Sequence, residues 1–489
     1  MAGPGSYTNG PGAREVAELA PAPKRIKVNS GSWQHFVGPS YAVSGLLCTD
    51  HRMTVPLDHS GKVPGTIDVF FRELVHRNKK EDKSLGYLLF LQGGCCCCVG
   101  AAGLCCGPGF EAARPMDLSG WMKQAANYFR IILLDQRGTG RSTAVSCDNL
   151  AARGAPEQQA QYLKFFRADS IVRDAELIRR AVVSGGRWSI LGQSFGGFCC
   201  ATYLSLAPEG LLEVLITGGL PPGIHQPCSA DDVYRRTFRR VLRQNEKFYQ
   251  RFPTDVEAAQ KIVLHLAAQP GGVTSPAGNR ITPRSFQLLG LQALGFSHGF
   301  ERLHYLLESA WDGQQLSQKF KKDFDSWMAW DTNPLYAILH ESIYCQGAAS
   351  NWAAHRIREA EYAAEFDAVA RAKAGKPVMF TGEMVFPWMF DEFAELRKIK
   401  EAANLLAADA DWPALYNERL LQETSVPVVA ATYYEDMFVD FDLAQETAGS
   451  INGIRQWITN EYLHCGIREA GGTIVERLLN MARGGLLLR

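Results

Sequence analysis

Short apolar runs recur along the first half of the chain, each closed by a polar or glycine-rich turn. Runs of this length fit strands that are buried on both faces of a sheet. A stretch with helical periodicity, Gln158–Val183, separates two of them. This alternation predicts a mostly parallel central sheet with helices on both faces, the α/β class. The runs are Gly86–Leu91, Phe129–Leu134, Trp188–Leu191 and Glu213–Thr217.

From Pro221 to about Lys376 the pattern becomes helical and rich in aromatic and charged residues, with no convincing strand. Such a segment cannot extend the sheet, so it predicts an inserted helical cap. Sheet-like runs return at Lys376–Gly382, Ser425–Tyr434 and Ile454–Thr459, and Thr473–Ala482 predicts a closing helix. The predicted domains are a disordered tail (1–35), a first core part (36–220), the cap (221–375) and a second core part (376–489).

The amino-terminal region predicts a tail followed by a hairpin. The first thirty residues are rich in Gly, Pro and Ala and lack the apolar core of a secretory signal. We interpret their basic run P-A-P-K-R-I-K as solvated charge. Beyond it, Tyr41–Val55 and Thr66–Leu74 flank the turn sequence D-H-S-G and predict two strands that pair at the sheet edge.

Charge and cysteine usage narrow the function classes. The 489 residues contain 51 Lys+Arg and 51 Asp+Glu, a balance that argues against nucleic acid or an anionic membrane as partner. No apolar run approaches the length of a membrane span. Six of the 13 cysteines fall between Cys95 and Cys106, and the others lack metal-ligand spacing. We therefore expect reduced thiols, no metal, and a cytoplasmic protein.

The segment L-G-Q-S-F-G-G, Leu191–Gly197, predicts a nucleophile. An apolar strand runs into it and a helical stretch follows, so Ser194 lies on a sharp strand-to-helix turn with its hydroxyl exposed. By contrast, D-Q-R-G-T-G-R-S, Asp135–Ser142, lacks the spacing of a phosphate-binding loop. There we expect a structural turn whose Asp135 and Arg137 tie loops together beside the site.

A serine nucleophile needs a base, and the base needs an orienting acid. Asp436 directly follows one late strand and His464 follows the next, which gives the order Ser, Asp, His of α/β-hydrolases. We prefer Asp436 to Asp440 and Asp442, which we expect to cap or flank the following helix.

The oxyanion hole needs two backbone donors, and the sequence offers one candidate for each. The N–H of Phe195 directly follows the nucleophile, and Gly94 lies in the loop after Gly86–Leu91.

A set of motifs in this order resembles the proline iminopeptidase family: L-Q-G-G and P-G-F-E, D-Q-R-G-T-G-R-S, G-Q-S-F-G-G-F, T-G-E-M, Y-Y-E-D-M-F-V-D and N-E-Y-L-H-C-G. The resemblance implies an α/β-hydrolase with a helical cap that releases N-terminal proline from peptides. It implies Ser194, Asp436 and His464 as the triad, no metal or other cofactor, and cap carboxylates for the free amine of the substrate. Glu341 and Glu383 are the candidates for the amine, with Phe386, Trp388, Phe390 and Trp352 as candidate pocket walls.

One departure from the family pattern falls in the loop that should supply an oxyanion donor. The residues Cys95–Gly107 separate Gly94 from Pro108, and their removal would restore L-Q-G-G-P-G-F-E. A metal or redox site is the weakest interpretation, since adjacent cysteines cannot all reach one ion. A tolerated surface loop is a second. We favour a third, the translation of unspliced or misassembled coding sequence.

The sequence thus predicts a serine exopeptidase that acts on peptides with a free N-terminus through an acyl-enzyme. Two alternatives stay open at this point. The same triad could serve an esterase or amidase, which would also cleave N-blocked substrates. A catalytically impaired scaffold would follow if the cysteine-rich segment disables the oxyanion loop.

Overall fold

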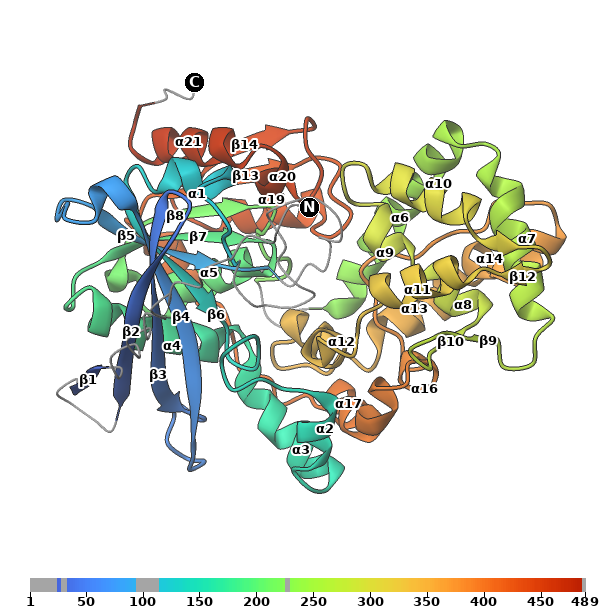
Figure 1. Ribbon diagram of the computed structural model, residues 1–489, viewed down its shortest axis with the longest axis horizontal. Helices are drawn as coiled ribbons and strands as arrows, with labels where there is room; N and C mark the ends of the chain where they lie inside the picture. Colours follow the sequence, from blue (N-terminus) through green and yellow to red (C-terminus); the bar gives the residue numbers. More distant parts are fainter. Residues whose placement is uncertain (1–23, 28–32, 94–113, 225–228, 486–489) are drawn as a thin grey trace, which may run out of the picture.

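The computed structural model describes residues 24–27, 33–93, 114–224 and 229–485. Two parts lie side by side: a twisted sheet with helices on its faces, and an almost wholly helical part (Figure 1). The predicted oxyanion residue Gly94 and the segment Cys95–Gly107 lie outside the described residues.

The sheet has ten strands in the order β1-β2-β3-β4-β6-β5-β7-β8-β13-β14. The strands β1 to β4 and β6 pair antiparallel, and β6-β5-β7-β8-β13-β14 are parallel. The fold class predicted from the alternating runs, a mostly parallel α/β sheet, is therefore confirmed. The strands are β1 (Lys24–Lys27), β2 (Gln34–Val43), β3 (Leu46–Pro56), β4 (Thr66–His76), β5 (Gly86–Leu91), β6 (Phe129–Asp135), β7 (Trp188–Gln193), β8 (Leu211–Thr217), β13 (Val428–Tyr433) and β14 (Arg455–Thr459).

Each central strand is apolar on both faces because both faces are covered. Leu88 and Phe90 of β5 face α1 (Gly120–Ala125) and α21 (Gly471–Ala482). The alternate residues Leu89 and Leu91 belong to a second cluster with α4 (Ala168–Val182) and α5 (Phe195–Leu206). Side chains alternate across a strand, so burial on both faces requires the continuous apolar run seen in the sequence.

The antiparallel end of the sheet differs from the prediction. The stretch Tyr41–Val55 is two strands, because the chain turns at Gly45 with φ 80°. The hairpin of β3 and β4 forms as expected but does not lie at the edge, since β2 and β1 continue the sheet. Lys24–Lys27, expected in the disordered tail, pairs with β2, so that part of the prediction is wrong.

The helical part follows β8 and contains two minimal hairpins, β9 (Val273–Thr274) with β10 (Arg280–Ile281) and β11 (Trp311–Asp312) with β12 (Gln315–Leu316). The helices between β8 and β13 are α6 (Ala230–Arg251), α7 (Asp255–Ala267), α8 (Pro283–Gln287), α9 (Gly290–Ala293), α10 (Gly299–Glu308), α11 (Gln318–Trp327), α12 (Pro334–Leu339), η4 (Glu341–Tyr344), α13 (Ala353–Glu361), α14 (Ala363–Phe366), α15 (Ala368–Lys373), α16 (Met389–Glu392), η5 (Leu396–Ile399), α17 (Lys400–Ala408) and α18 (Glu418–Glu423).

The strand predicted over Lys376–Gly382 is absent, and the sheet resumes only at Val428. The apolar segment is extended, but side chains satisfy its backbone in place of a neighbouring strand. Asn245 bonds both the N–H and the C=O of Phe380, and Gln287 donates to the C=O of Met379. An apolar run alone cannot distinguish these two ways of pairing a buried backbone.

The division of the chain into domains stays a prediction.

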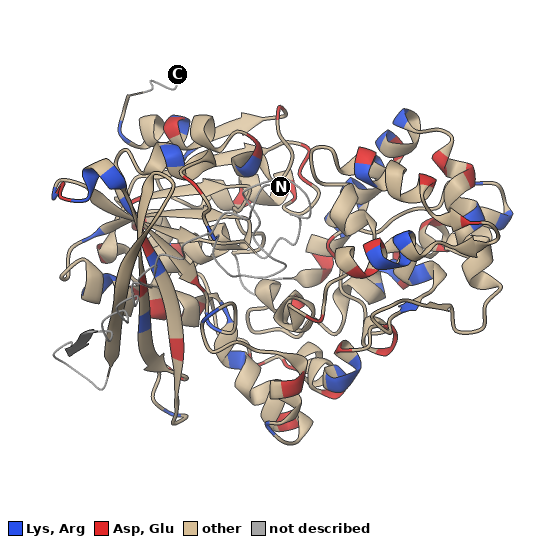
Figure 2. Cartoon of the chain, viewed as in Figure 1, with Lys and Arg blue, Asp and Glu red and all other residues tan. Residues whose placement is uncertain are grey.

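Basic and acidic residues are interspersed along the chain in both parts of the molecule (Figure 2). This arrangement matches the equal number of positive and negative residues in the sequence. Within the described ranges, no helix combines the length and the apolar character needed to cross a bilayer.

Candidate active site

Ser194 lies between β7 and α5 with φ 55° and ψ −126°, the strained conformation expected at this turn. Glycines make the turn possible, because a Cβ at Gly196 would collide with the carbonyl of Leu91 in β5. A Cβ at Gly197 would collide in the same way with the carbonyl of Gly219. The close approach of three backbones thus fixes the position of the serine hydroxyl.

The structure brings the three predicted residues into one hydrogen-bonded chain. The Ser194 Oγ lies 2.9 Å from Nε2 of His464, and Nδ1 of His464 lies 2.7 Å from Oδ2 of Asp436. An ionised carboxylate only accepts, so Nδ1–H donates to Asp436 and Nε2 is left to accept from the serine. All three side chains are buried. This arrangement can move a proton from the serine to the histidine.

Residues 434–440, here called the acid loop, connect β13 to α19 (Phe441–Gly449) and hold Asp436. Its Oδ1 accepts from the backbone N–H groups of Phe438 and Val439, at 2.8 and 3.0 Å, which leaves Oδ2 for His464. Asp440 instead accepts from the backbone of Asp442 and Leu443 at the start of α19. The expected capping role of Asp440 is therefore confirmed.

His464 has a perturbed acidity. Burial lowers its pKa, but the charge and the hydrogen bond of Asp436 outweigh burial and raise the pKa from 6.5 to about 9. The folded chain therefore holds this proton more tightly than the unfolded chain. Its stabilising effect is complete below pH 6.5 and is lost as the pH rises through about 9.

We expect kcat/KM to rise with pH along a limb whose apparent pKa lies well above 6.5, towards 9, because only neutral His464 can accept the serine proton. The measurement is the pH dependence of kcat/KM for an amide substrate. In Asp436→Asn the limb should shift to lower pH, since the stabilising charge is gone. A limb at or below 6.5 in the parent protein would contradict this assignment.

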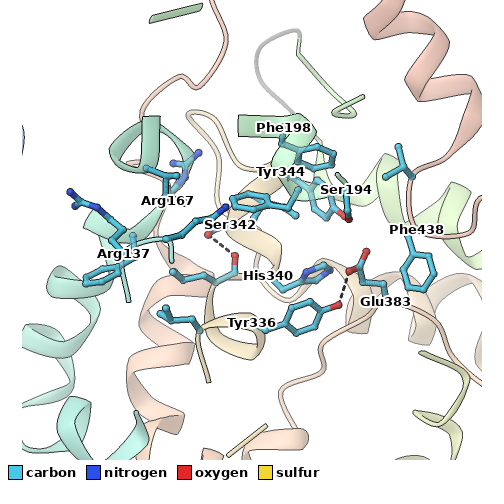
Figure 3. Close-up of a pocket in the computed structure, with 18 residues that line it drawn as sticks. Arg137, Arg167, Ser194, Phe198, Tyr336, His340, Ser342, Tyr344, Glu383 and Phe438 are labelled. Atoms are coloured by element: carbon cyan, nitrogen blue, oxygen red, sulfur yellow. Dashed lines mark hydrogen bonds between the residues drawn. The ribbon is translucent and has the colours of Figure 1, made fainter. Parts of the chain in front are cut away.

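A cavity opens from Ser194 towards the helical part (Figure 3). Glu383 is the one carboxylate among its described lining residues, and it lies at the Ser194 end, with Arg137 and Arg167 at the other end. The Oη of Tyr336 donates to Oε1 of Glu383 at 2.6 Å. The lining also includes Phe195, Phe198, Leu335, Leu339, His340, Ile343, Tyr344, Phe438 and Val439.

Glu341, the other predicted amine ligand, does not face this cavity. Its two carboxylate oxygens accept from the backbone N–H groups of Ala353 and Ala354, at 3.1 and 3.0 Å, at the start of α13. Burial raises its pKa, while these donors act in the opposite direction. Glu341 therefore caps α13, contrary to the expectation. The preceding residue, His340, lines the cavity, and successive residues of a helical turn point in different directions, so the Glu341 side chain points elsewhere.

The predicted aromatic walls are also misplaced. Phe386 stacks on Trp388, and both are buried in the core, as is Phe390; Trp352 is partly buried and packs against Phe390. The residues that do line the cavity include Tyr336, His340 and Tyr344, spaced i, i+4, i+8 over α12 and η4. That helical spacing is the signal in the sequence that could have identified this wall.

Of the two candidate oxyanion donors, the structure describes Phe195 but not Gly94. Phe195 is the first residue of α5, so its N–H lies at the positive end of the helix, next to Ser194. Gly94 is not described. The preceding Gly93 passes so close to the nucleophile that a Cβ there would collide with Cβ of Ser194. The loop after β5 thus starts directly beside the serine.

Arg137 is the structural tie expected of D-Q-R-G-T-G-R-S. Its guanidinium donates to both oxygens of Asp174, at 2.7 and 2.6 Å, and to the carbonyls of Leu57 and Phe165. Asp135 accepts two bonds from Arg114 and one from the backbone of Arg141. Buried charges of this kind are stable only when paired, so the turn fixes the loops beside the site.

Comparison with known proteins shows which family the chain belongs to. Residues 104–264 match a family model described as the alpha/beta hydrolase fold. A proline iminopeptidase from Aeromonas sobria is 48% identical over 444 residues, which are 91% of this chain and 98% of the relative. Proline iminopeptidase aneH from Aspergillus aculeatus is 32% identical over 88% of this chain and 92% of its own length. Among solved structures, a thermophilic esterase from Thermogutta terrifontis has TM-score 0.36 and 12% identity, covering 87% of this chain and 96% of its own.

Proposed function

This chain belongs to the proline iminopeptidase family of α/β-hydrolases, and on that premise we propose that it is a serine exopeptidase that releases N-terminal proline from peptides. The observation that supports the chemistry is the hydrogen-bonded chain of Ser194, His464 and Asp436. Ser194 lines a cavity in which Glu383 is the one carboxylate among the described lining residues. Peptides with a free N-terminus are the proposed partners.

In the proposed reaction, Nε2 of His464 takes the proton of Ser194 as Oγ attacks the carbonyl carbon of the first residue. Asp436 orients the imidazole and stabilises its charged form. The N–H of Phe195 donates to the developing oxyanion, and the loop after β5, with Gly94, supplies the second donor. His464 then gives its proton to the leaving amine, and water hydrolyses the acyl-enzyme by the reverse steps.

We propose that Glu383 receives the protonated amine of the substrate. Its position beside Ser194 restricts how far a peptide can enter, because the amine must reach the carboxylate while the first carbonyl reaches the serine. An ammonium group that donates to a carboxylate forms a short, strong hydrogen bond. Only the first peptide bond then meets the nucleophile, which explains exopeptidase action.

Hydrolysis of proline naphthylamide and of its N-acetyl derivative tests the proposal. We expect kcat/KM to be roughly 100-fold or more higher for the free amine, since the blocked substrate has no cationic amine to donate to Glu383. Equal rates for the two substrates would instead support an esterase or amidase with the same triad.

A parallel assay of the chain without Cys95–Gly107 determines what that segment does. If only the shortened chain is active, the segment blocks the oxyanion loop. If neither chain hydrolyses the free amine, the proposed peptidase activity is wrong and a ligand-binding scaffold replaces it.

We further propose that the protein resides in the cytoplasm. Among the described cysteines, Cys48, Cys147, Cys199 and Cys200 are buried thiols that form no disulfide. Buried reduced thiols are typical of a reducing compartment. Fractionation of cells that express the tagged full chain tests this location.

A further inference from the structure

Helix α6 of the helical part lies across the acid loop. Arg240 on this helix donates from Nε to Oδ2 of Asp440 at 2.8 Å, and from Nη1 to the carbonyl of Tyr434 at 3.3 Å. One guanidinium thus holds the first and the last residue of the loop. The Arg240 side chain is 12% exposed and that of Asp440 only 4%, so water screens this pair weakly.

Two further residues of α6 hold the loop from the same side. Nε2 of Gln244 donates to the carbonyl of Glu435 at 3.3 Å, and Nζ of Lys247 lies 2.9 Å from the carboxylate of Glu435. Residues 240, 244 and 247 are spaced i, i+4, i+7 and so share one face of the helix. The helix therefore contacts the residue on the amino side of Asp436 as well as both ends of its loop.

The orientation of Asp436 depends on the shape of this loop. Oδ1 of Asp436 is held by the backbone of Phe438 and Val439, within the same loop. The ring of Phe438 in turn packs against the imidazole of His464, with centroids 4.6 Å apart. A shift of the loop would move the acid and one wall of the imidazole together, and misplacements of about 1 Å can cost roughly 100-fold in rate.

We propose that Arg240 is a positioning residue for catalysis, which holds the acid loop so that Asp436 meets His464. This inference rests on the proposed function, and it gives the helical part a second role besides enclosing substrate. Arginine suits the task because its planar fork reaches two acceptors at once, whereas a lysine ammonium is a single point charge.

The test is Arg240→Gln in the full chain. We expect kcat to fall about 10- to 100-fold while KM for proline naphthylamide stays within about twofold, since the amine site is untouched. Arg240→Lys should recover part of the loss, because the ammonium can still pair with Asp440. The matched control is Arg239→Gln, the same change at the exposed neighbouring position of α6, with kcat within about twofold of the parent.

A second measurement separates this inference from the proposed function. A fluorophosphonate ester reacts with an activated serine, forming the Ser194 Oγ–P bond and releasing fluoride and the serine proton, and needs no proline site. Slower labelling of Arg240→Gln, at an unchanged folded fraction by circular dichroism, supports the positioning role even if proline naphthylamide is not cleaved. Labelling and kcat equal to the parent, or losses that only follow a loss of folded protein, overturn it.

Discussion

Ser194→Ala is expected to lower kcat/KM for proline naphthylamide by roughly 10⁴- to 10⁶-fold while the protein stays folded. The hydroxyl is the proposed nucleophile, and its 2.9 Å contact with Nε2 of His464 is the contact through which the histidine would take its proton. Alanine leaves the backbone of the turn unchanged and removes one oxygen. Steady-state kinetics and the urea unfolding midpoint of the variant are the measurements.

The control for this change is Ser205→Ala on α5, the helix that follows Ser194. Ser205 is buried and donates to the carbonyl of Ala201, away from the cavity. Its loss should alter stability by about 1 kcal/mol and leave kcat near that of the parent. Turnover in Ser194→Ala comparable to that of Ser205→Ala would show that another residue is the nucleophile.

Glu383→Gln should lower kcat/KM for the free-amine substrate by roughly 100- to 1000-fold. The carboxamide keeps the shape of the side chain and its bond to Tyr336, but it removes the charge that the carboxylate would offer to the substrate ammonium in the cavity. The residual activity on N-acetylproline naphthylamide should not fall, since that substrate has no charge to pair. The ratio of the two rates is therefore the decisive measurement.

Glu341→Gln is the matched control, because the same change is made in a buried carboxylate outside the cavity. It should weaken the cap of α13 and so lower stability, while the ratio of free to blocked substrate stays that of the parent. If the ratio changed in Glu341→Gln and not in Glu383→Gln, the assignment of the amine site would be reversed.

The sequence predicted the parallel strands well because burial on both faces leaves an unambiguous apolar run, as in β5 and β7. It failed at Lys376–Gly382, where the same kind of run is paired by Asn245 and Gln287. The local pattern of apolar residues cannot predict hydrogen bonds from side chains that lie so far away in the chain.

For the candidate site too, the sequence predicted some positions and missed others. The segment around Ser194, and the positions of Asp436 and His464 after successive strands, follow from the order of elements in a parallel sheet. Glu341 was misassigned because residue type alone does not say which face of a short helix it occupies. The role inferred for Arg240 was not visible in the sequence, since its partner lies far along the chain and enters through tertiary packing.

The long insertion between β8 and β13 also determines when, during synthesis, the sheet and the site at its edge can be completed. Because β13 pairs with β8, one edge of β8 stays unpaired during synthesis until the ribosome has made the whole segment between the two strands. Closing so long a loop is slow compared with local helix formation. Asp436 and His464 both come after this insertion in the chain, so a nascent chain contains Ser194 before its proposed acid and base. If the proposed triad is correct, we expect an enzyme that trims amino termini to be inactive towards surrounding nascent chains until its own synthesis has passed His464.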